Sequence, residues 1–131
     1  SNPSLSRQGP RIARVDAIAC PSAYVVDGDT LRCGSIRLRL LGIDAPELPG
    51  HCARYRECAP GDGFSSKRRL IDALRNGRVS YSIVTTDRFG RYVVVAWAGR
   101  VNLSCWQLQA RQAVYKPRWD NGGLIRQSCG L

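Results

Sequence analysis

The sequence predicts a mostly-β domain, a small closed barrel of five short strands with two to three helices packed on it. Short runs of alternating apolar and polar residues are separated by glycine-containing turns, which is typical of antiparallel strands. A helical segment follows the third run, instead of one helix after each strand, so a parallel α/β architecture is disfavoured. A chain of 131 residues, 44% of them hydrophobic, is long enough for one domain with its own core.

The first third of the chain contains three predicted strands. Residues 1–10 are polar with two prolines and are expected to form a flexible arm, so the domain would span residues 11–131. Residues 11–20 and 23–33 alternate loosely around an Asp-Gly turn, which indicates two antiparallel strands. After a second turn, residues 36–43 alternate cleanly and separate an apolar face from one with two arginines. The two faces hold Ile36, Leu38 and Leu40 on one side, and Arg37, Arg39 and Leu41 on the other.

The middle of the chain is expected to supply a long loop, a helix and two more strands. Residues 45–63 are loop-like, with three prolines and several glycines. Residues 64–76 have leucines one turn apart and are followed by Gly77, which predicts a helix and its end. Residues 79–84 and 92–98 are strand-like.

The C-terminal part begins with a second helix. Asn102 is suited to cap a helix that runs to about Gln112, and the tail beyond it is irregular apart from one helical turn. The resulting order is three strands, a helix, two strands and a helix. This order matches a five-stranded barrel of the OB type.

The charge of the chain favours a polyanionic partner. The formal net charge is +10, and eighteen of the 20 basic residues are arginine, whose planar fork grips phosphate oxygens in pairs. Nucleic acid is the first candidate, ahead of acidic membrane surfaces and polysaccharides. The arginine excess is explained equally well by codon bias in a GC-rich genome. No apolar run approaches the length of a membrane span, so none is expected.

The six cysteines predict three disulfides and therefore an oxidising compartment, meaning a secreted or periplasmic protein. The absence of a CxxC pair and the presence of a single histidine, His51, argue against a zinc site. Sequence leaves the connectivity open, and six buried free thiols in a cytosolic protein are the alternative. The expected pairs are Cys20–Cys33 across a hairpin, Cys52–Cys58 within a loop, and Cys105–Cys129 between a helix and the tail.

The segment 26–47 (VDGDTLRCGSIRLRLLGIDAPE) concentrates groups that suit phosphate chemistry. Asp29 and Asp44 stand at the ends of short apolar runs, with Arg39 between them and Glu47 just beyond. Carboxylates suit a hard divalent cation, a guanidinium suits a phosphate, and a carboxylate base suits an attacking water. Ca²⁺ is favoured over Mg²⁺, because the ligands on offer are oxygens. Turn chemistry explains either aspartate taken alone, but the full combination is much harder to obtain by accident.

This segment resembles the core of the staphylococcal (micrococcal, thermonuclease-like) nuclease family, a calcium-dependent group built on a five-stranded OB barrel with helices. The similarity runs from about Val15 to Pro117, and it is strongest over residues 26–47 and over Asp87–Arg91 (DRFGR). The resemblance implies hydrolysis of phosphodiester bonds in DNA and/or RNA, with the 5′-oxygen leaving. No protein partner is evident from the sequence, and a monomer is expected.

The resemblance also implies a role for each matching residue. Calcium would be bound by the carboxylates of Asp29 and Asp44 and by the backbone carbonyl of Ala45, with Asp27 behind them. Glu47 would orient or deprotonate the attacking water. The scissile phosphate would be clamped by Arg39 and Arg91.

Three positions depart from the family's pattern, and they keep a rival hypothesis open. Ala45 replaces a threonine, Phe89 a tyrosine, and Ala113 another aromatic residue, so base contacts would be weaker or supplied by Tyr115 and Trp119. Ordinary packing explains those two side chains as well. The rival is a non-catalytic OB module that binds nucleic acid or a protein through its positive charge.

Overall fold

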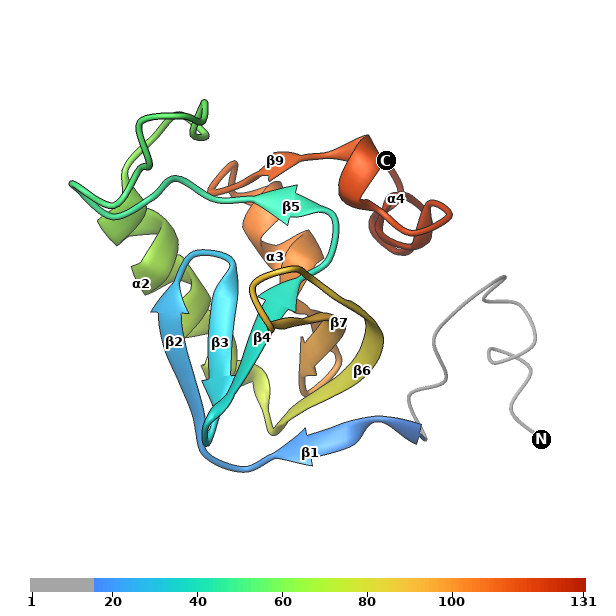
Figure 1. Cartoon of the computed structure of the whole chain (residues 1–131). Coiled ribbons are helices and arrows are strands. Elements are labelled where there is room, and N and C mark those ends of the chain that lie inside the picture. Colours follow the sequence, from blue (N-terminus) through green and yellow to red (C-terminus); the bar gives the residue numbers. More distant parts are fainter. Residues whose placement is uncertain (1–15) are drawn as a thin grey trace.

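The computed structural model describes residues 16–131. The predicted flexible arm and the start of the first predicted strand, residues 11–15, lie outside this range. One curled, half-barrel sheet dominates the fold, in the strand order β1-β6-β7-β4-β3-β2, with β8 added beside β7 (Figure 1). Its strands are β1 (Ile18–Cys20), β2 (Ala23–Asp27), β3 (Thr30–Cys33), β4 (Ile36–Leu40), β6 (Val79–Thr86), β7 (Tyr92–Ala98) and β8 (Val101–Asn102).

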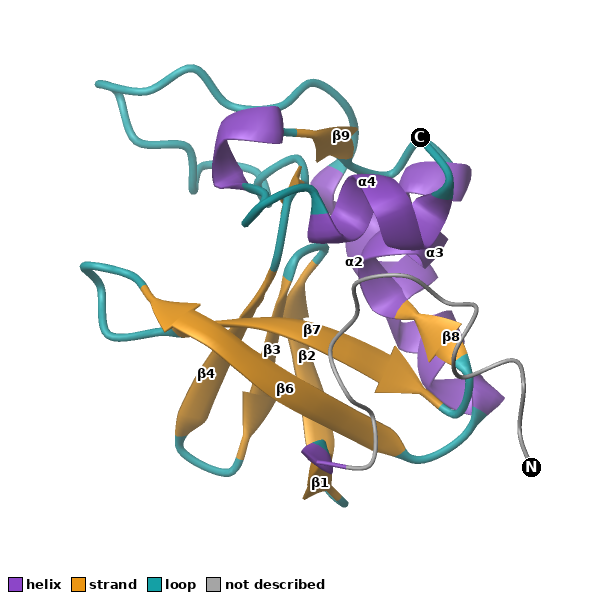
Figure 2. Ribbon diagram, turned by 90° about the vertical axis from the view of Figure 1, so that its right-hand side faces the viewer, coloured by secondary structure: helices purple, strands orange, loops and turns teal. Residues whose placement is uncertain are grey.

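Three helices gather on one side of this sheet (Figure 2). They are α2 (Gly63–Ala73), α3 (Leu103–Gln109) and α4 (Leu124–Cys129), and short 3-10 turns follow α2 at Leu74–Asn76 and precede α4 at Pro117–Trp119. A second, two-stranded sheet pairs β5 (Ile43–Asp44) with β9 (Val114–Tyr115). The mostly-β prediction with two to three helices is therefore confirmed.

The predicted hairpin at Asp27-Gly28 is present and continues into β4. β2, β3 and β4 form an antiparallel meander in which Val25 faces Leu31 and Thr30 faces Arg39. The segment 18–20 does not join this meander; as β1 it pairs antiparallel with β6, with Ile18 opposite Tyr81. The meander brings the Asp-Gly turn and the exit of β4 to the same end of the sheet.

Both predicted helices form, with adjusted ends. The predicted helix 64–76 is α2 with its 3-10 extension, and Asp62 caps it by accepting a hydrogen bond from the amide of Phe64 (2.9 Å). Asn102 caps α3 as predicted, by accepting a hydrogen bond from the amide of Cys105 (3.1 Å). This helix ends at Gln109 instead of Gln112, because the chain reverses at Arg111, whose φ is 56°.

The tail is more ordered than predicted. It contains β9 and α4, where a single helical turn was expected. Asp120 organises it by accepting hydrogen bonds from the hydroxyl of Tyr115 (2.6 Å) and from the amides of Ile125 and Arg126 (both 3.0 Å). Ile125 is fully buried, so the tail contributes to the core.

The main core lies between the curled sheet and helices α2 and α3. Leu38 and Leu40 of the predicted apolar face are buried in it, whereas Ile36 at the start of β4 is 39% exposed. The other fully buried large residues of this core include Leu31, Ile43, Leu70, Val94 and Leu103. Because α2 and α3 pack on the sheet next to the Asp-Gly turn, core packing also positions the residues around that turn.

The three expected disulfides are the ones present. Cys20–Cys33 joins β1 to β3, Cys52–Cys58 closes a loop between β5 and α2, and Cys105–Cys129 joins α3 to α4. This pattern is that of a protein from an oxidising environment. Within residues 16–131, no helix is both long enough and apolar enough to cross a lipid bilayer.

Candidate functional site

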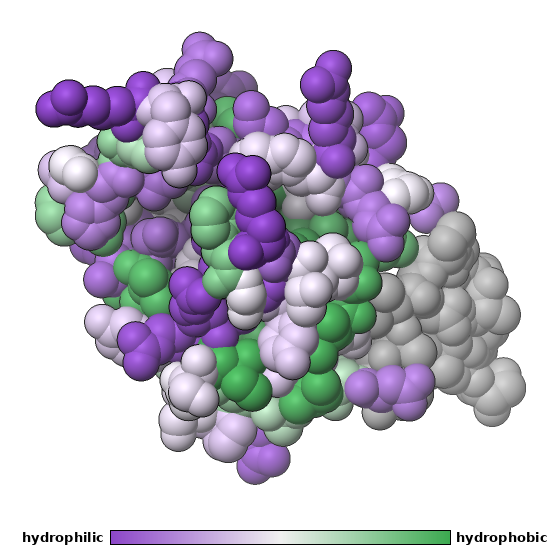
Figure 3. All heavy atoms as spheres, in the orientation of Figure 1, coloured by the Kyte–Doolittle hydropathy of each residue, from purple (hydrophilic) through white to green (hydrophobic). Residues whose placement is uncertain are grey.

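A cleft of about 750 Å³ opens where the meander, the long loop, the β6–β7 hairpin and the tail meet. Five of the six predicted site residues line it, although they come from three separate segments of the chain: Asp29, Arg39, Asp44, Glu47 and Arg91. The sixth, Ala45, is buried directly beneath, 2% exposed. On the face shown in Figure 3, long hydrophilic side chains project from the upper part, and hydrophobic side chains gather in the lower part.

Two glycines hold the backbone of the site against α2. A Cβ on Gly28 would lie 1.9 Å from Ser66 Oγ, and a Cβ on Gly63 would lie 2.3 Å from the carbonyl oxygen of Glu47. Because glycine has no Cβ, the backbone at Gly28 can approach the Ser66 side chain, and the backbone at Gly63 can approach that of Glu47. The side-chain amide of Gln107 adds a buried hydrogen bond to the carbonyl of Gly28 (2.8 Å). The turn that carries Asp29 and the backbone of Glu47 therefore share one support.

Asp29 lies at the bottom of the cleft, 3% exposed, and both of its carboxylate oxygens have partners. Oδ1 accepts a hydrogen bond from the hydroxyl of Thr30 (3.0 Å), and Oδ2 accepts one from the amide of Ala45 (2.9 Å). Arg39 Nη1 lies 2.6 Å from Oδ2, because the β3–β4 register places Thr30 opposite Arg39. Burial acts to raise the pKa of Asp29, but the Arg39 charge and the hydrogen bonds outweigh it, so the pKa lies below its ordinary value.

Asp44 ends β5 and is 1% exposed. Its Oδ2 lies 3.1 Å from Arg56 Nη2, and its Oδ1 lies 3.7 Å from Arg39 Nη2. Oδ1 is buried and accepts no hydrogen bond from any residue of the described range 16–131. A buried carboxylate oxygen without a hydrogen bond is costly, so this atom is a natural point of attachment for a ligand.

Glu47 stands at the edge of the cleft with 22% of its side chain exposed. Burial and then the negative charge of Asp29 raise its pKa, and the charge of Arg56 acts in the opposite direction. Asp27, which the sequence placed behind the ligands, also lines the cleft, and its side chain accepts a hydrogen bond from the amide of Asp29 (3.2 Å). Burial, and then the Asp29 charge, raise the pKa of Asp27 to about 7.

Arg39 is not the solvated outward side chain that strand alternation alone would suggest. Its side chain is 12% exposed, donates to the carbonyl of Ile43 (3.1 Å) and lies over the ring of Trp119, 5.3 Å from the ring centre. Its two ion pairs with Asp29 and Asp44 hold its pKa above the ordinary arginine value despite burial. The buried carboxylates therefore fix this guanidinium between them.

Arg91 enters the cleft from the β6–β7 hairpin. Asp87 orients it, since Oδ2 lies 2.7 Å from Arg91 Nε and Oδ1 accepts a hydrogen bond from the Arg91 amide (3.0 Å). The side chain remains 23% exposed. Phe89 at the tip of the same hairpin is 53% exposed and lies under the guanidinium of Arg91, 5.5 Å from ring centre to Cζ.

One charged residue of the site is not distinguished by the sequence. Arg56 bridges Asp44 and Glu47, with Nη1 3.2 Å from Glu47 Oε1. It lies in the short segment CARYREC, where Arg54 offers the same side chain two residues away. Only the path of the loop shows which of the two arginines enters the cleft.

The aromatic residues near the cleft separate into two kinds. Trp119 lines it and is 43% exposed, whereas the hydroxyl of Tyr115 is committed to Asp120. Ala113 is buried and does not line the cleft, while His51 does. Of these two aromatic residues, Trp119 is therefore the one whose ring is exposed in the cleft.

The carboxylates of the cleft suit a hard cation, but they do not supply enough ligands by themselves. The converging carboxylates offer only oxygen ligands, and Asp44 Oδ1 is a buried acceptor without a hydrogen bond. Across residues 16–131, no group of three or more His, Cys, Asp or Glu side chains is arranged to hold a metal ion. A cation here would need backbone carbonyl and water oxygens as further ligands, which calcium accepts. No protein-family model matches this sequence, and no curated protein matches it significantly.

Proposed function

We propose that this protein is a calcium-dependent, sugar-nonspecific nuclease of the staphylococcal type, exported and monomeric, whose curled sheet is an OB-type barrel. It hydrolyses phosphodiester bonds in DNA and/or RNA, with the 5′-oxygen leaving. The observation that carries the proposal is the convergence of Asp29, Arg39, Asp44, Glu47 and Arg91 on one cleft. The net charge of +10 adds a long-range attraction for nucleic acid.

The two buried aspartates would hold the cation. Asp29 and Asp44 lie on opposite sides of Arg39, and the carbonyl of Ala45 would complete the protein's share of the ligands. When bound, calcium neutralises charge on the scissile phosphate and makes a bound water easier to deprotonate. The family's threonine hydroxyl is absent at Ala45, so only its backbone is on offer.

The remaining groups act on water and phosphate. Glu47 is positioned at the cleft edge, where its carboxylate would orient the attacking water and accept its proton. Arg39 and Arg91 would donate to the phosphate oxygens, from β4 and from the β6–β7 hairpin respectively. A phosphodiester is already an anion and repels a nucleophile, so positive charge fixed in place before attack is what the reaction needs.

A non-catalytic nucleic-acid-binding or protein-binding module is the second candidate, and one observation favours it. Arg39 and Arg56 already pair with the carboxylates assigned to the cation and the water, so the cleft is close to charge balance as it stands. A surface with this much positive charge binds nucleic acid without any cation.

Digestion of single-stranded DNA by the purified, oxidised protein separates the two candidates. The assay compares calcium with chelator, and wild type with Glu47→Gln, which keeps the shape of the side chain and removes the base. Calcium-dependent cleavage that the variant loses supports the nuclease. Salt-sensitive retention of DNA with no cleavage at any calcium concentration would overturn it in favour of the binding module.

A further inference from the structure

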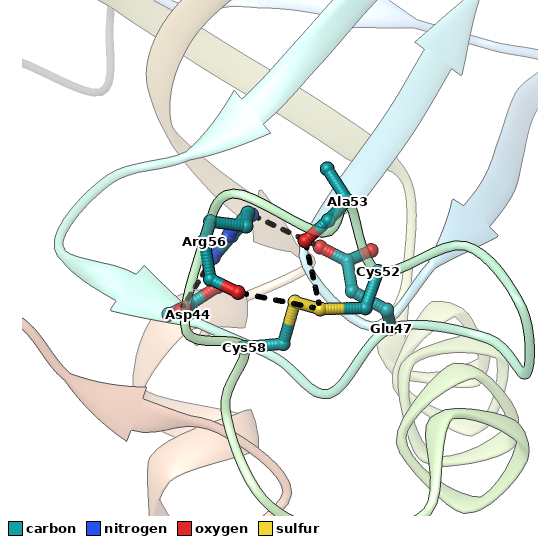
Figure 4. The surroundings of a disulfide bond; sticks show 6 residues. All are labelled: Asp44, Glu47, Cys52, Ala53, Arg56 and Cys58. Atoms are coloured by element: carbon teal, nitrogen blue, oxygen red, sulfur yellow. Dashed lines mark hydrogen bonds and ion pairs between the residues drawn. A yellow bond between two sulfur atoms is a disulfide. The ribbon is translucent and has the colours of Figure 1, made fainter.

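The Cys52–Cys58 loop delivers a guanidinium to the two carboxylates that the proposed function assigns to cation and water. Close to this disulfide, the guanidinium of Arg56 pairs with the side chains of Asp44 and Glu47 (Figure 4). The loop turns tightly at this point, since the amide of Arg56 donates to the carbonyl of Ala53 (3.2 Å). The disulfide joins two cysteines six positions apart in sequence, and it therefore restrains the backbone from which the Arg56 side chain extends.

We propose that Arg56 determines the affinity of the site for calcium by competing with the cation for Asp44, and that the Cys52–Cys58 disulfide holds this competitor in place. The inference rests on the proposed function, because it takes Asp44 as a cation ligand. It adds a residue and a crosslink that the resemblance to the nuclease family does not supply.

Charge and geometry set the direction of the effect. Arg56 Nη2 is within hydrogen-bonding distance of Asp44 Oδ2 (3.1 Å), on the same carboxylate whose buried Oδ1 accepts no hydrogen bond from residues 16–131 and is open to a cation. A guanidinium at this distance repels a divalent ion bound to the same carboxylate. Cation binding must therefore displace Arg56 from Asp44 or accept its repulsion, and either cost weakens binding.

Arg56 is the partner that can leave. Its side chain is 33% exposed, so its guanidinium can turn toward solvent with little change in hydration. Arg39, the other guanidinium beside Asp44, is 12% exposed and is also held by Asp29 at 2.6 Å and by the carbonyl of Ile43. Displacement by a cation therefore falls first on Arg56, the less constrained of the two guanidiniums beside Asp44.

The disulfide makes the competition effective. In an open loop, Arg56 would lose side-chain and backbone entropy each time it paired with Asp44. Closing the loop removes part of that cost in advance and raises the local concentration of the guanidinium at the carboxylates. Opening the loop should therefore act in the same direction as removing Arg56, and less strongly.

Calorimetric titration with calcium alone tests the inference without any cleavage assay. The proteins compared are wild type, Arg56→Gln, Arg56→Lys and the control Arg54→Gln. Arg54 lies in the same loop, is exposed and does not line the cleft, so the control removes an equal charge. We expect Arg56→Gln to bind calcium about ten-fold more tightly, the scale of one lost charge-assisted hydrogen bond. Arg56→Lys should fall between wild type and Arg56→Gln, since a single ammonium cannot bridge both carboxylates as the fork does. It keeps the test valid if Arg56→Gln folds poorly.

The double variant Cys52→Ser/Cys58→Ser tests the contribution of the crosslink and leaves the other two disulfides intact. Its calcium affinity should rise by a few-fold, less than in Arg56→Gln. An affinity unchanged from wild type in this double variant would overturn the part assigned to the disulfide.

The outcomes separate this inference from the proposed function. Equal calcium affinity in wild type, Arg56→Gln and Arg56→Lys would overturn the inference alone. Tighter binding by Arg56→Gln in a protein that cleaves no DNA would support the inference and overturn the nuclease. Absence of calcium binding in every variant would overturn both.

Discussion

The two sides of the cleft are built differently. The floor, Asp29, Arg39 and Asp44, is buried and is held by strand register and by the packing of the sheet. The rim, Glu47 and Arg56, is partly exposed and belongs to the long loop between β5 and α2, part of which is crosslinked by Cys52–Cys58. The side chains of the floor therefore have a fixed geometry, whereas those of the rim can change their ion-pair partners. Groups that bind a cation benefit from the first property, because a site functions best when its ligands are already held in place.

The largest expected effect contrasts one residue from each side. Glu47→Gln should lower the rate of DNA cleavage by about 10² to 10⁴-fold, the usual contribution of a general base, and leave stability nearly unchanged. Arg39→Gln should lower the rate by a similar factor, and in addition destabilise the fold by about 3 kcal/mol, because Asp29 is left buried without its charge partner.

Cleavage kinetics and urea unfolding measure the two parts of this contrast. Arg54→Gln, which changes charge on the exposed part of the loop, is the control for both. Equal stability of Arg39→Gln and Glu47→Gln would show that the floor is no more rigid than the rim.

Removing disulfides sharpens the same contrast. Opening Cys105–Cys129, whose sequence separation is 24, should cost about 3 kcal/mol in unfolding free energy, while opening Cys52–Cys58, whose separation is 6, should cost about 2 kcal/mol. The order should be inverted for function, because the Cys52–Cys58 loop carries Arg56, which pairs with Asp44 and Glu47. Thermal unfolding and cleavage assays of the two Cys→Ser double variants measure this, and a larger functional loss from opening Cys105–Cys129 would contradict it.

The smallest effect concerns the β6–β7 hairpin, which belongs to neither side. Slight burial acts to raise the pKa of Asp87, but hydrogen bonds from Arg91 and the Arg91 charge hold it below its ordinary value of 3.8. A carboxylate with a lowered folded-state pKa adds stability above that ordinary value, and the contribution is lost as the pH falls through the folded pKa.

The stability difference between wild type and Asp87→Asn should accordingly be present at pH 7 and shrink as the pH falls below about 4. Urea unfolding across this pH range measures it. A difference that grows toward acid pH would mean that the Asp87–Arg91 pair does not stabilise the hairpin.

The predictions from sequence succeeded where the signals were local. Periodicity, the Asp-Gly turn, the Asn102 cap and the Gly77 stop identified the longer strands and both main helices within a few residues, but not the two-residue strands β5, β8 and β9. They were less accurate in the tail, where Asp120 connects β9 and α4 through three hydrogen bonds that sequence periodicity does not predict. The pairing of β1 with β6 was also not predicted, because the local sequence of a strand contains little information about which distant strand it pairs with.

By itself, the sequence determined the residue types of the site and their spacing along the segment 26–47, because ligand chemistry depends on side-chain identity. It suggested the disulfide pairs but left their connectivity open, and the structure confirms the expected pairs. The tertiary structure alone decided that Arg39 is buried between two aspartates and that Arg56, and not Arg54, closes the cleft. The physical reason is that burial and ion pairing depend on which residues are neighbours in space. Arg54 and Arg56 have the same side chain, but the path of the loop brings only the guanidinium of Arg56 within reach of the buried carboxylates.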